Sequence, residues 1–182
     1  MTIMSDYEIK QEAGMIIPFT GCKVREGNLS WGLSSFGYDV RLGRKGVSYY
    51  SSPKLVINPL EFDQADLISN VLEFDVDGVI LEAGRFMLLH TEEVFSLPND
   101  VCAVVRDKST LARLGLAVQN TVLEPGWRGQ LTIEVSNHGD LDIELSWLMP
   151  IAQIQFFRGS TVETPYMGSY QDQTNVTLPK GG

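Results

Sequence analysis

Short apolar stretches separated by turn-forming residues dominate the hydrophobic pattern of this chain. Segments rich in Val, Ile, Leu and Phe recur between Gly, Pro, Asn and Asp residues, at 38–43, 54–59, 78–84, 85–91, 102–106, 130–137, 141–147 and 151–157. Strand-like segments at this spacing, with little helical periodicity between them, are typical of an all-β sandwich or barrel rather than of βαβ units. We therefore predict a mainly β fold with a few short helices.

Two segments carry helix signals instead. In 5–14, Ser5 can cap a helix, Glu8 completes a capping box and Gly14 is expected to end it. The segment 108–115 predicts about one and a half helical turns that end at a glycine. A third segment, 59–70, fits neither pattern and predicts a loop with a helical turn.

Composition narrows the class of protein. A length of 182 residues favours one domain, 1–182, and no apolar run approaches the roughly 20 residues needed to span a membrane. The acidic N-terminal segment has no apolar signal core, so we expect a cytoplasmic protein. The net charge of −9 argues against general binding to DNA or RNA, because such binding needs many Lys and Arg residues. A small anionic ligand remains compatible with this net charge, because a pocket needs only a few cations.

Zinc chemistry is not expected from the residues present. The only histidines are His90 and His138, and the sequence has no Cys-x-x-Cys pair to accompany either of them. Zinc-dependent nucleobase deaminases and structural zinc sites need such ligands. Mg²⁺ that arrives on a phosphate group stays open.

The clearest candidate for chemistry is the alternating segment 130–137. It separates an apolar face from a polar face, with Leu131, Ile133 and Val135 on one side and Thr132, Glu134 and Ser136 on the other. On the predicted turn at 108–115, Ser109 and Arg113 are four residues apart and share a face. Both observations also fit ordinary surface groups, so the pattern alone indicates a β domain with a possible small-anion pocket.

Asp39 and Arg41 lie two residues apart on one predicted strand. Side chains at this spacing point to the same face of a strand. We expect them to form a structural ion pair.

Taken as an ordered set, several segments resemble the dCTP deaminase family, the zinc-free branch of the dUTPase-like superfamily. The segments are "SDYEIKQ" (5–11), "SSFGYDVRLG" (34–43), "KSTLARLGL" (108–116), "LEPGWRGQLTIEVSN" (123–137) and "YQDQTNVTLP" (170–179). The resemblance implies a distorted β-barrel of jelly-roll type, assembled as a homotrimer with active sites at the subunit interfaces. It further implies conversion of dCTP to dUTP and ammonia, Mg²⁺ bound through the substrate phosphates, and a tail, 165–182, that closes over the nucleotide.

Carried over by position, the resemblance also implies roles for individual residues. Glu134 matches the catalytic glutamate, Arg113 the arginine beside it and Ser109 the serine of the site. A backbone carbonyl near Thr121–Val122 would hold the attacking water. The implied substrate-binding residues are Lys108, Ser109, Thr110, Arg113, Glu124, Thr132, Tyr166, Tyr170 and Gln173.

Four positions depart from the family pattern. Asp107 replaces a glycine, Ser169 a lysine and Thr174 an arginine, and Asp172 adds a carboxylate. Fewer cations should weaken the hold on a triphosphate, which makes dCMP or a modified cytosine nucleotide an alternative substrate.

Two further alternatives concern the activity itself. Glu124 stands where dUTPases place a water-activating Asp, so dUTP pyrophosphatase activity, alone or beside deamination, is one alternative. A non-catalytic nucleotide-binding regulator is the other.

Overall fold

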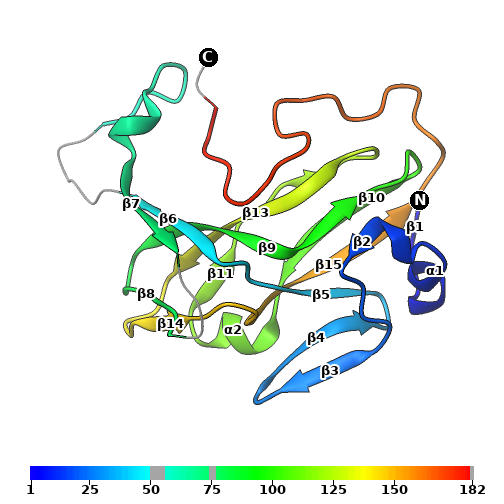
Figure 1. Ribbon diagram of the computed structural model, residues 1–182, viewed down its shortest axis with the longest axis horizontal. Coiled ribbons are helices and arrows are strands. Elements are labelled where there is room, and N and C mark those ends of the chain that lie inside the picture. Colours follow the sequence, from blue (N-terminus) through cyan, green and yellow to red (C-terminus); the bar gives the residue numbers. More distant parts are fainter. Residues whose placement is uncertain (50–55, 74–76, 181–182) are drawn as a thin grey trace.

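Two β-sheets form the body of the molecule (Figure 1). The structure, a computed structural model, describes residues 1–49, 56–73 and 77–180. One sheet has seven strands, in the order β12 (Val122–Leu123), β10 (Val101–Asp107), β15 (Pro150–Arg158), β5 (Gly37–Arg41), β4 (Leu29–Ser34) and β3 (Lys23–Glu26), with β1 (Thr2–Ile3) paired to β15. The other has six, in the order β11 (Leu116–Val118), β13 (Arg128–Asn137), β9 (Phe86–Ser96), β6 (Lys45–Tyr49) and β7 (Ile68–Glu73), with β2 (Ile16–Ile17) paired to β9.

Among the described residues, a two-stranded sheet and four short helical segments complete the fold. The two-stranded sheet pairs β8 (Val79–Leu81) with β14 (Ile143–Leu145). The helices are α1 (Asp6–Gln11) and α2 (Ser109–Arg113), and 3₁₀ turns occupy Ala13–Met15 and Gln64–Asp66. Every pairing within the two main sheets is antiparallel. The mainly β fold class predicted from the hydrophobic pattern is confirmed.

Side chains from both sheets fill the core. Tyr38, Ile154 and Phe156 come from the seven-stranded sheet, and Leu89 and Ile133 come from the six-stranded sheet; all are fully buried. Burial of an aliphatic or aromatic side chain of this size contributes about 1.5–3 kcal/mol. The alternation expected for 130–137 is therefore correct, since its apolar face joins this core.

The predicted helices form, with one difference at an end. Ser5 and Glu8 make the expected capping box, in which the Ser5 amide donates to the Glu8 carboxylate at 2.8 Å. That helix ends at Gln11, however, and Gly14 lies in the following 3₁₀ turn. Gly115 ends α2 as predicted, with a φ of +95°, and a Cβ there would lie 2.7 Å from the Gly139 amide nitrogen.

The strand predictions are mostly right, but they differ from the structure in several places, and β6, β11 and β12 are among the strands that were not predicted. Residues 56–59 form no strand, while positions 54 and 55 of the same prediction lie outside the described residues. The predicted loop 59–70 does contain a helical turn, but β7 begins within it at Ile68. The hairpin of β3 and β4 was not predicted, because most of β3 is exposed and its polar sequence has no apolar stripe.

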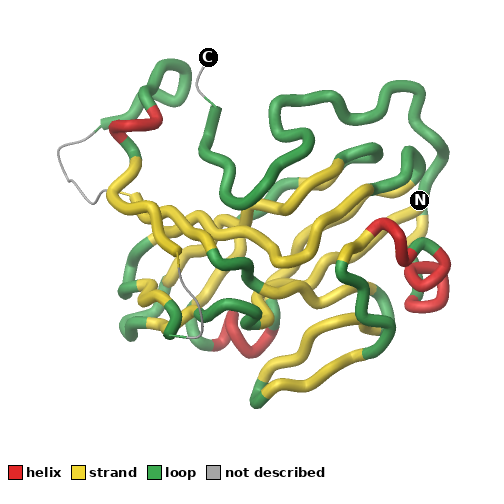
Figure 2. The backbone as a smooth tube through the Cα atoms, viewed as in Figure 1, coloured by secondary structure: helices red, strands yellow, loops and turns green. Residues whose placement is uncertain are grey.

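The C-terminal tail has no helix or strand from 160 to 180 and runs across the six-stranded sheet beside β13 (Figure 2). Its backbone approaches β13 closely at Gly129, which has a φ of +135°. A Cβ at Gly129 would lie 2.6 Å from the Gln173 amide nitrogen, so only glycine allows this approach. Among the described residues, no helix has the length and apolar character to cross a membrane.

Candidate active site

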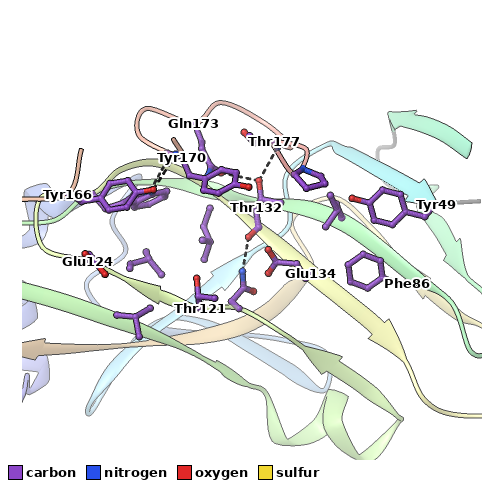
Figure 3. Close-up of a pocket in the computed structure, with 17 residues that line it drawn as sticks. Tyr49, Phe86, Thr121, Glu124, Thr132, Glu134, Tyr166, Tyr170, Gln173 and Thr177 are labelled. Carbon is purple, nitrogen blue, oxygen red and sulfur yellow. Dashed lines mark hydrogen bonds between the residues drawn. The ribbon is translucent and has the colours of Figure 1, made fainter. Parts of the chain in front are cut away.

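A cavity of about 730 Å³ lies between the polar face of β13 and the C-terminal tail (Figure 3). Its lining residues come from β6, β9, the segment 120–127, β13 and the tail: Tyr49, Phe86, Leu88, Asn120, Thr121, Val122, Leu123, Glu124, Trp127, Leu131, Thr132, Glu134, Tyr166, Tyr170, Gln173, Thr177 and Pro179. Six of the residues predicted for the site are therefore brought together here, namely Glu124, Thr132, Glu134, Tyr166, Tyr170 and Gln173.

Glu134 stands in this cavity without compensation for its charge. Its Oε2 atom is buried and has no hydrogen-bond partner among the described residues. Burial raises the pKa of Glu134 to about 7, and a hydrogen bond with its own backbone opposes that shift. A carboxyl group with a pKa near neutrality can both accept and release a proton at physiological pH.

Aromatic side chains flank this carboxyl group. Tyr49 and Phe86 stack with ring centroids 5.5 Å apart, and Figure 3 shows them on one side of Glu134. Burial raises the pKa of the Tyr49 phenol, and the nearby Glu134 charge adds to that shift. The cavity therefore joins an apolar, aromatic wall to one strongly perturbed carboxyl group, a combination typical of sites that bind and transform small molecules.

Hydrogen bonds fasten the tail over the cavity. The Thr132 hydroxyl donates to the Gln173 side-chain oxygen at 3.0 Å and accepts from the Thr177 amide at 2.9 Å (Figure 3). The Gln130 amide donates to the Gln173 carbonyl at 2.9 Å, and the Trp127 indole donates to the Tyr170 carbonyl at 2.8 Å. The tail is thus anchored along β13 by both side-chain and backbone groups.

An exposed ion pair also connects the tail to β13. The Arg128 guanidinium donates to both oxygens of Asp172, at 3.0 and 3.1 Å. The pair lowers the pKa of Asp172. The carboxylate that departs from the family pattern is therefore matched by a cation of the same chain.

The four remaining candidates lie outside this cavity. Lys108, Ser109 and Thr110 line a second pocket of about 270 Å³, together with Lys23, Asn28, Leu29, Ser30, Asp39, Asp107 and Gln153. Arg113 is exposed and donates through Nη1 to the Ser109 carbonyl at 3.3 Å. Ser109 and Arg113 do share a face of α2, as expected, but this face does not line the cavity that contains Glu134.

Lys108 is held by a buried carboxylate. Its Nζ lies 2.8 Å from Asp39 Oδ2, and the side chains are 10% and 3% exposed. The expected ion pair between Asp39 and Arg41 is wrong, because Arg41 instead pairs with the buried Glu93 at 2.9 Å. Two residues on one strand face share an orientation, but neighbouring elements decide which partner each one meets.

Asp107 forms a hydrogen bond that connects two strands. Its Oδ1 accepts a hydrogen bond from the Val118 amide at 2.7 Å, which links the end of β10 to β11. The carboxylate that replaces a family glycine therefore satisfies a backbone group, although it also lines the second pocket.

Sequence reasoning missed several cavity residues. Tyr49 and Phe86 lie outside the recognised segments, and no local pattern connects them to Glu134. Asn120 stands just before the recognised "LEPGW" segment, and its polar side chain in a short connection is the one signal that could have marked it. Thr121 and Val122, near the predicted water-holding carbonyl, do line the cavity.

Comparisons with known proteins identify the family. The sequence model of the family described as dCTP deaminase-like matches residues 3–159, and the chain belongs to that family. It is 39% identical over 173 residues to a dCTP deaminase of Campylobacter jejuni, covering 93% of this chain and 91% of that protein. It is also 39% identical over 187 residues to a dCTP deaminase of Herpetosiphon aurantiacus, covering 99% and 100%.

The fold has a solved counterpart. The crystal structure of 2'-deoxycytidine 5'-triphosphate deaminase from Agrobacterium tumefaciens superposes with a TM-score of 0.63 and 20% sequence identity. The match covers 87% of this chain and 48% of the Agrobacterium chain, so this protein spans about half the length of that one. At this identity the likeness concerns the fold.

Proposed function

We propose that this protein catalyses the hydrolytic deamination of dCTP to dUTP and ammonia, with Glu134 as the proton carrier. The observation that carries the proposal is the buried, unpartnered Oε2 atom of Glu134 in a partly aromatic cavity. Curated relatives that bear the name dCTP deaminase match nearly the whole chain. The alternatives, a dUTP pyrophosphatase, a dCMP or modified-cytosine deaminase and a silent regulator, are not favoured.

One carboxyl group can serve both halves of the reaction. In the first half, Glu134 takes a proton from water as the oxygen bonds to C4 of cytosine, and it passes this proton to N3. In the second, Glu134 moves the proton of the new C4 hydroxyl group to the amine, the bond between C4 and nitrogen breaks, ammonia leaves and C4 becomes a carbonyl. General acid–base help of this kind contributes about 10²–10⁴-fold to the rate.

The remaining cavity residues would bind the nucleotide. Glu124, Tyr166 and Tyr170 line the cavity beyond Glu134, while Thr132 and Gln173 join its floor to the tail. In this arrangement the tail, 165–182, covers the bound nucleotide and excludes water other than the reactant. Such exclusion strengthens every electrostatic interaction in the site.

Mg²⁺ fits this proposal as an ion bound to the substrate. The ion usually keeps several waters and binds substrate phosphates with one or two carboxylates. In the described part of the chain, no group of three or more His, Cys, Asp or Glu side chains offers a cage of its own. Glu124 is a cavity carboxylate that could approach such an ion. The ion would offset the negative charge of the triphosphate.

The position of Ser109 and Arg113 bears on assembly. Both lie outside the cavity of Glu134 within one chain, whereas the resemblance implies a position for them beside the glutamate. A homotrimer in which α2 of one subunit faces the cavity of its neighbour would bring them together. Thr110 would then reach the phosphates from the same neighbour, and Lys108 would have to leave its 2.8 Å pair with Asp39 to do the same.

Subunit complementation tests this arrangement. Glu134→Gln and Arg113→Ala should each have very little activity alone, because every site lacks one essential group. After the two are unfolded together and refolded at equal concentration, about a quarter of the sites should combine an intact Glu134 with an intact Arg113. Ammonia release should recover accordingly. No recovery, in a mixture shown by light scattering to be trimeric, would place both residues in the same subunit.

The activity itself is tested with a panel of nucleotides. We expect ammonia release from dCTP, much less from dCMP, and no pyrophosphate release from dUTP. Pyrophosphate release without ammonia would replace the proposal by the dUTPase alternative. Binding without any product would identify a silent nucleotide-binding protein.

A further inference from the structure

A second unpartnered oxygen lies in the cavity beside Glu134. The Oδ1 atom of Asn120 is buried and has no hydrogen-bond partner among the described residues. Asn120 also lines the cavity. A buried acceptor without a donor costs about 1–3 kcal/mol, so a site keeps one where a ligand supplies the missing hydrogen bond.

The orientation of the Asn120 amide is determined by its other half. Its Nδ2 atom donates to the Thr132 carbonyl at 2.8 Å. A carbonyl oxygen can only accept, so the nitrogen must face Thr132 and the oxygen must face away from it. The amide therefore cannot turn to offer a donor to the cavity without losing this bond.

Backbone pairing places Asn120 next to Glu134. The amide of the preceding residue, Gln119, donates to the Glu134 carbonyl at 2.9 Å, while the Asn120 side chain reaches the Thr132 carbonyl. Residues 132 and 134 point to the same face of β13, toward the cavity. Asn120 is thus held alongside the strand between the two cavity side chains.

The chemistry of cytosine identifies the missing donor. On the base edge that Glu134 must reach, the 4-amino group is a donor, whereas N3 and O2 are acceptors. After deamination the same position carries a carbonyl oxygen, which is an acceptor. A fixed amide oxygen that faces this position accepts a hydrogen bond from the amino group of the substrate. The carbonyl oxygen of the product cannot donate one, and the two acceptors repel each other.

We propose that Asn120 is a specificity-determining residue, whose amide oxygen accepts a hydrogen bond from the 4-amino group of the cytosine base. The inference rests on the proposed function, because it takes a cytosine nucleotide as the ligand. Asn120 favours binding of substrate and promotes release of the uracil product. Thr132 links this residue to the tail, since the same residue bonds Asn120, Gln173 and Thr177.

Binding measurements test the assignment. Dissociation constants of dCTP and dUTP are compared by calorimetry in Glu134→Gln, which blocks turnover, with and without Asn120→Ala. Loss of one buried hydrogen bond predicts that the ratio of the dUTP constant to the dCTP constant falls about fivefold or more. Asn120→Leu, which fills the space, should give the same fall if the alanine variant is poorly folded.

Two controls separate recognition from structure. Gln119→Ala removes a side chain that bonds Ser136 at 2.9 Å outside the cavity, and it should leave the ratio unchanged. The deoxynucleoside triphosphate of pyrimidin-2-one, which has hydrogen at C4, should bind equally with and without Asn120. A ratio that changes by less than about twofold in both Asn120 variants, or equally in Gln119→Ala, would overturn the inference. Absence of ammonia release from dCTP in the unmutated protein would instead remove the proposed function.

Discussion

Two carboxylates in the two pockets of this protein differ in how the chain treats their charge. Asp39 accepts hydrogen bonds from Ser30 at 3.3 Å and Gln153 at 3.1 Å, and it pairs with Lys108 at 2.8 Å. Glu134 keeps one buried oxygen with no partner in the described residues. Both residues lie on strands, and both are removed from water to a large degree.

This difference distinguishes a carboxylate that stabilises the fold, Asp39, from a carboxylate available to a ligand, Glu134. Buried charges in folded proteins are normally paired and hydrogen-bonded, because desolvation is costly. Asp39 obeys this rule within its own chain. Glu134 breaks it, and burial shifts the pKa of Glu134 to about 7 as the consequence. An unsatisfied group of this kind is stable only in a protein whose remaining interactions offset its cost.

The largest expected effect is the loss of activity in Glu134→Gln. The amide keeps the shape of the side chain but cannot carry the proton, so ammonia release from dCTP should fall by about 10²–10⁴-fold. Nucleotide binding should persist in calorimetry. The free energy of unfolding should not decrease, because the substitution removes a carboxylate with one buried oxygen that has no partner in the described residues. Turnover close to that of the unmutated protein would contradict the assignment.

Asp39→Ala should show the opposite pattern, with a large loss of stability. It leaves the Lys108 ammonium, whose side chain is 10% exposed, without its buried partner. Removal of one member of a buried pair costs about 3–5 kcal/mol. Urea unfolding at fixed protein concentration measures the loss. Ser30→Ala, which removes only the 3.3 Å bond to Asp39, is the matched control and should cost far less.

The pH dependence of kcat/KM is expected to report the pKa of Glu134. Glu134 acts as a base, so activity should fall as pH decreases through its pKa. That pKa is about 7 in the single chain because of burial, and a nearby Arg113 of a neighbouring subunit would lower it by about 1–3 units. The unmutated enzyme should therefore inflect below 7, and the residual activity of Arg113→Ala should inflect near 7. Arg25→Ala, on the exposed strand β3, should leave the inflection in place.

The smallest effect is expected at the tail. Asp172→Asn removes the exposed ion pair with Arg128, whose side chains are 56% and 64% exposed. Surface pairs of this kind contribute little and are screened by salt. We expect KM for dCTP to rise about two- to fivefold at low ionic strength and the effect to vanish at high ionic strength. An equal change in the presence of Arg128→Ala would show that the pair is not the cause.

Local patterns in the sequence determined several elements of this protein. The period-two alternation of 130–137 places Leu131 and Ile133 in the core and Glu134 on the opposite face, because successive strand residues point to opposite sides. The capping box of Ser5 and Glu8 and the glycine at 115 are equally local. These features depend only on residues near one another in the chain, so the sequence by itself was sufficient to predict them.

Tertiary structure decided which groups meet. Asp39 was expected to pair with Arg41, but strand pairing and the position of α2 give it Lys108, about seventy residues away in the chain. Asn120 and Tyr49 enter the site only because the strands bring distant segments to one cavity. The tail covers the cavity of Glu134 because it folds back across β13 and bonds Thr132. Such partnerships depend on long-range packing, and no spacing along the chain encodes them.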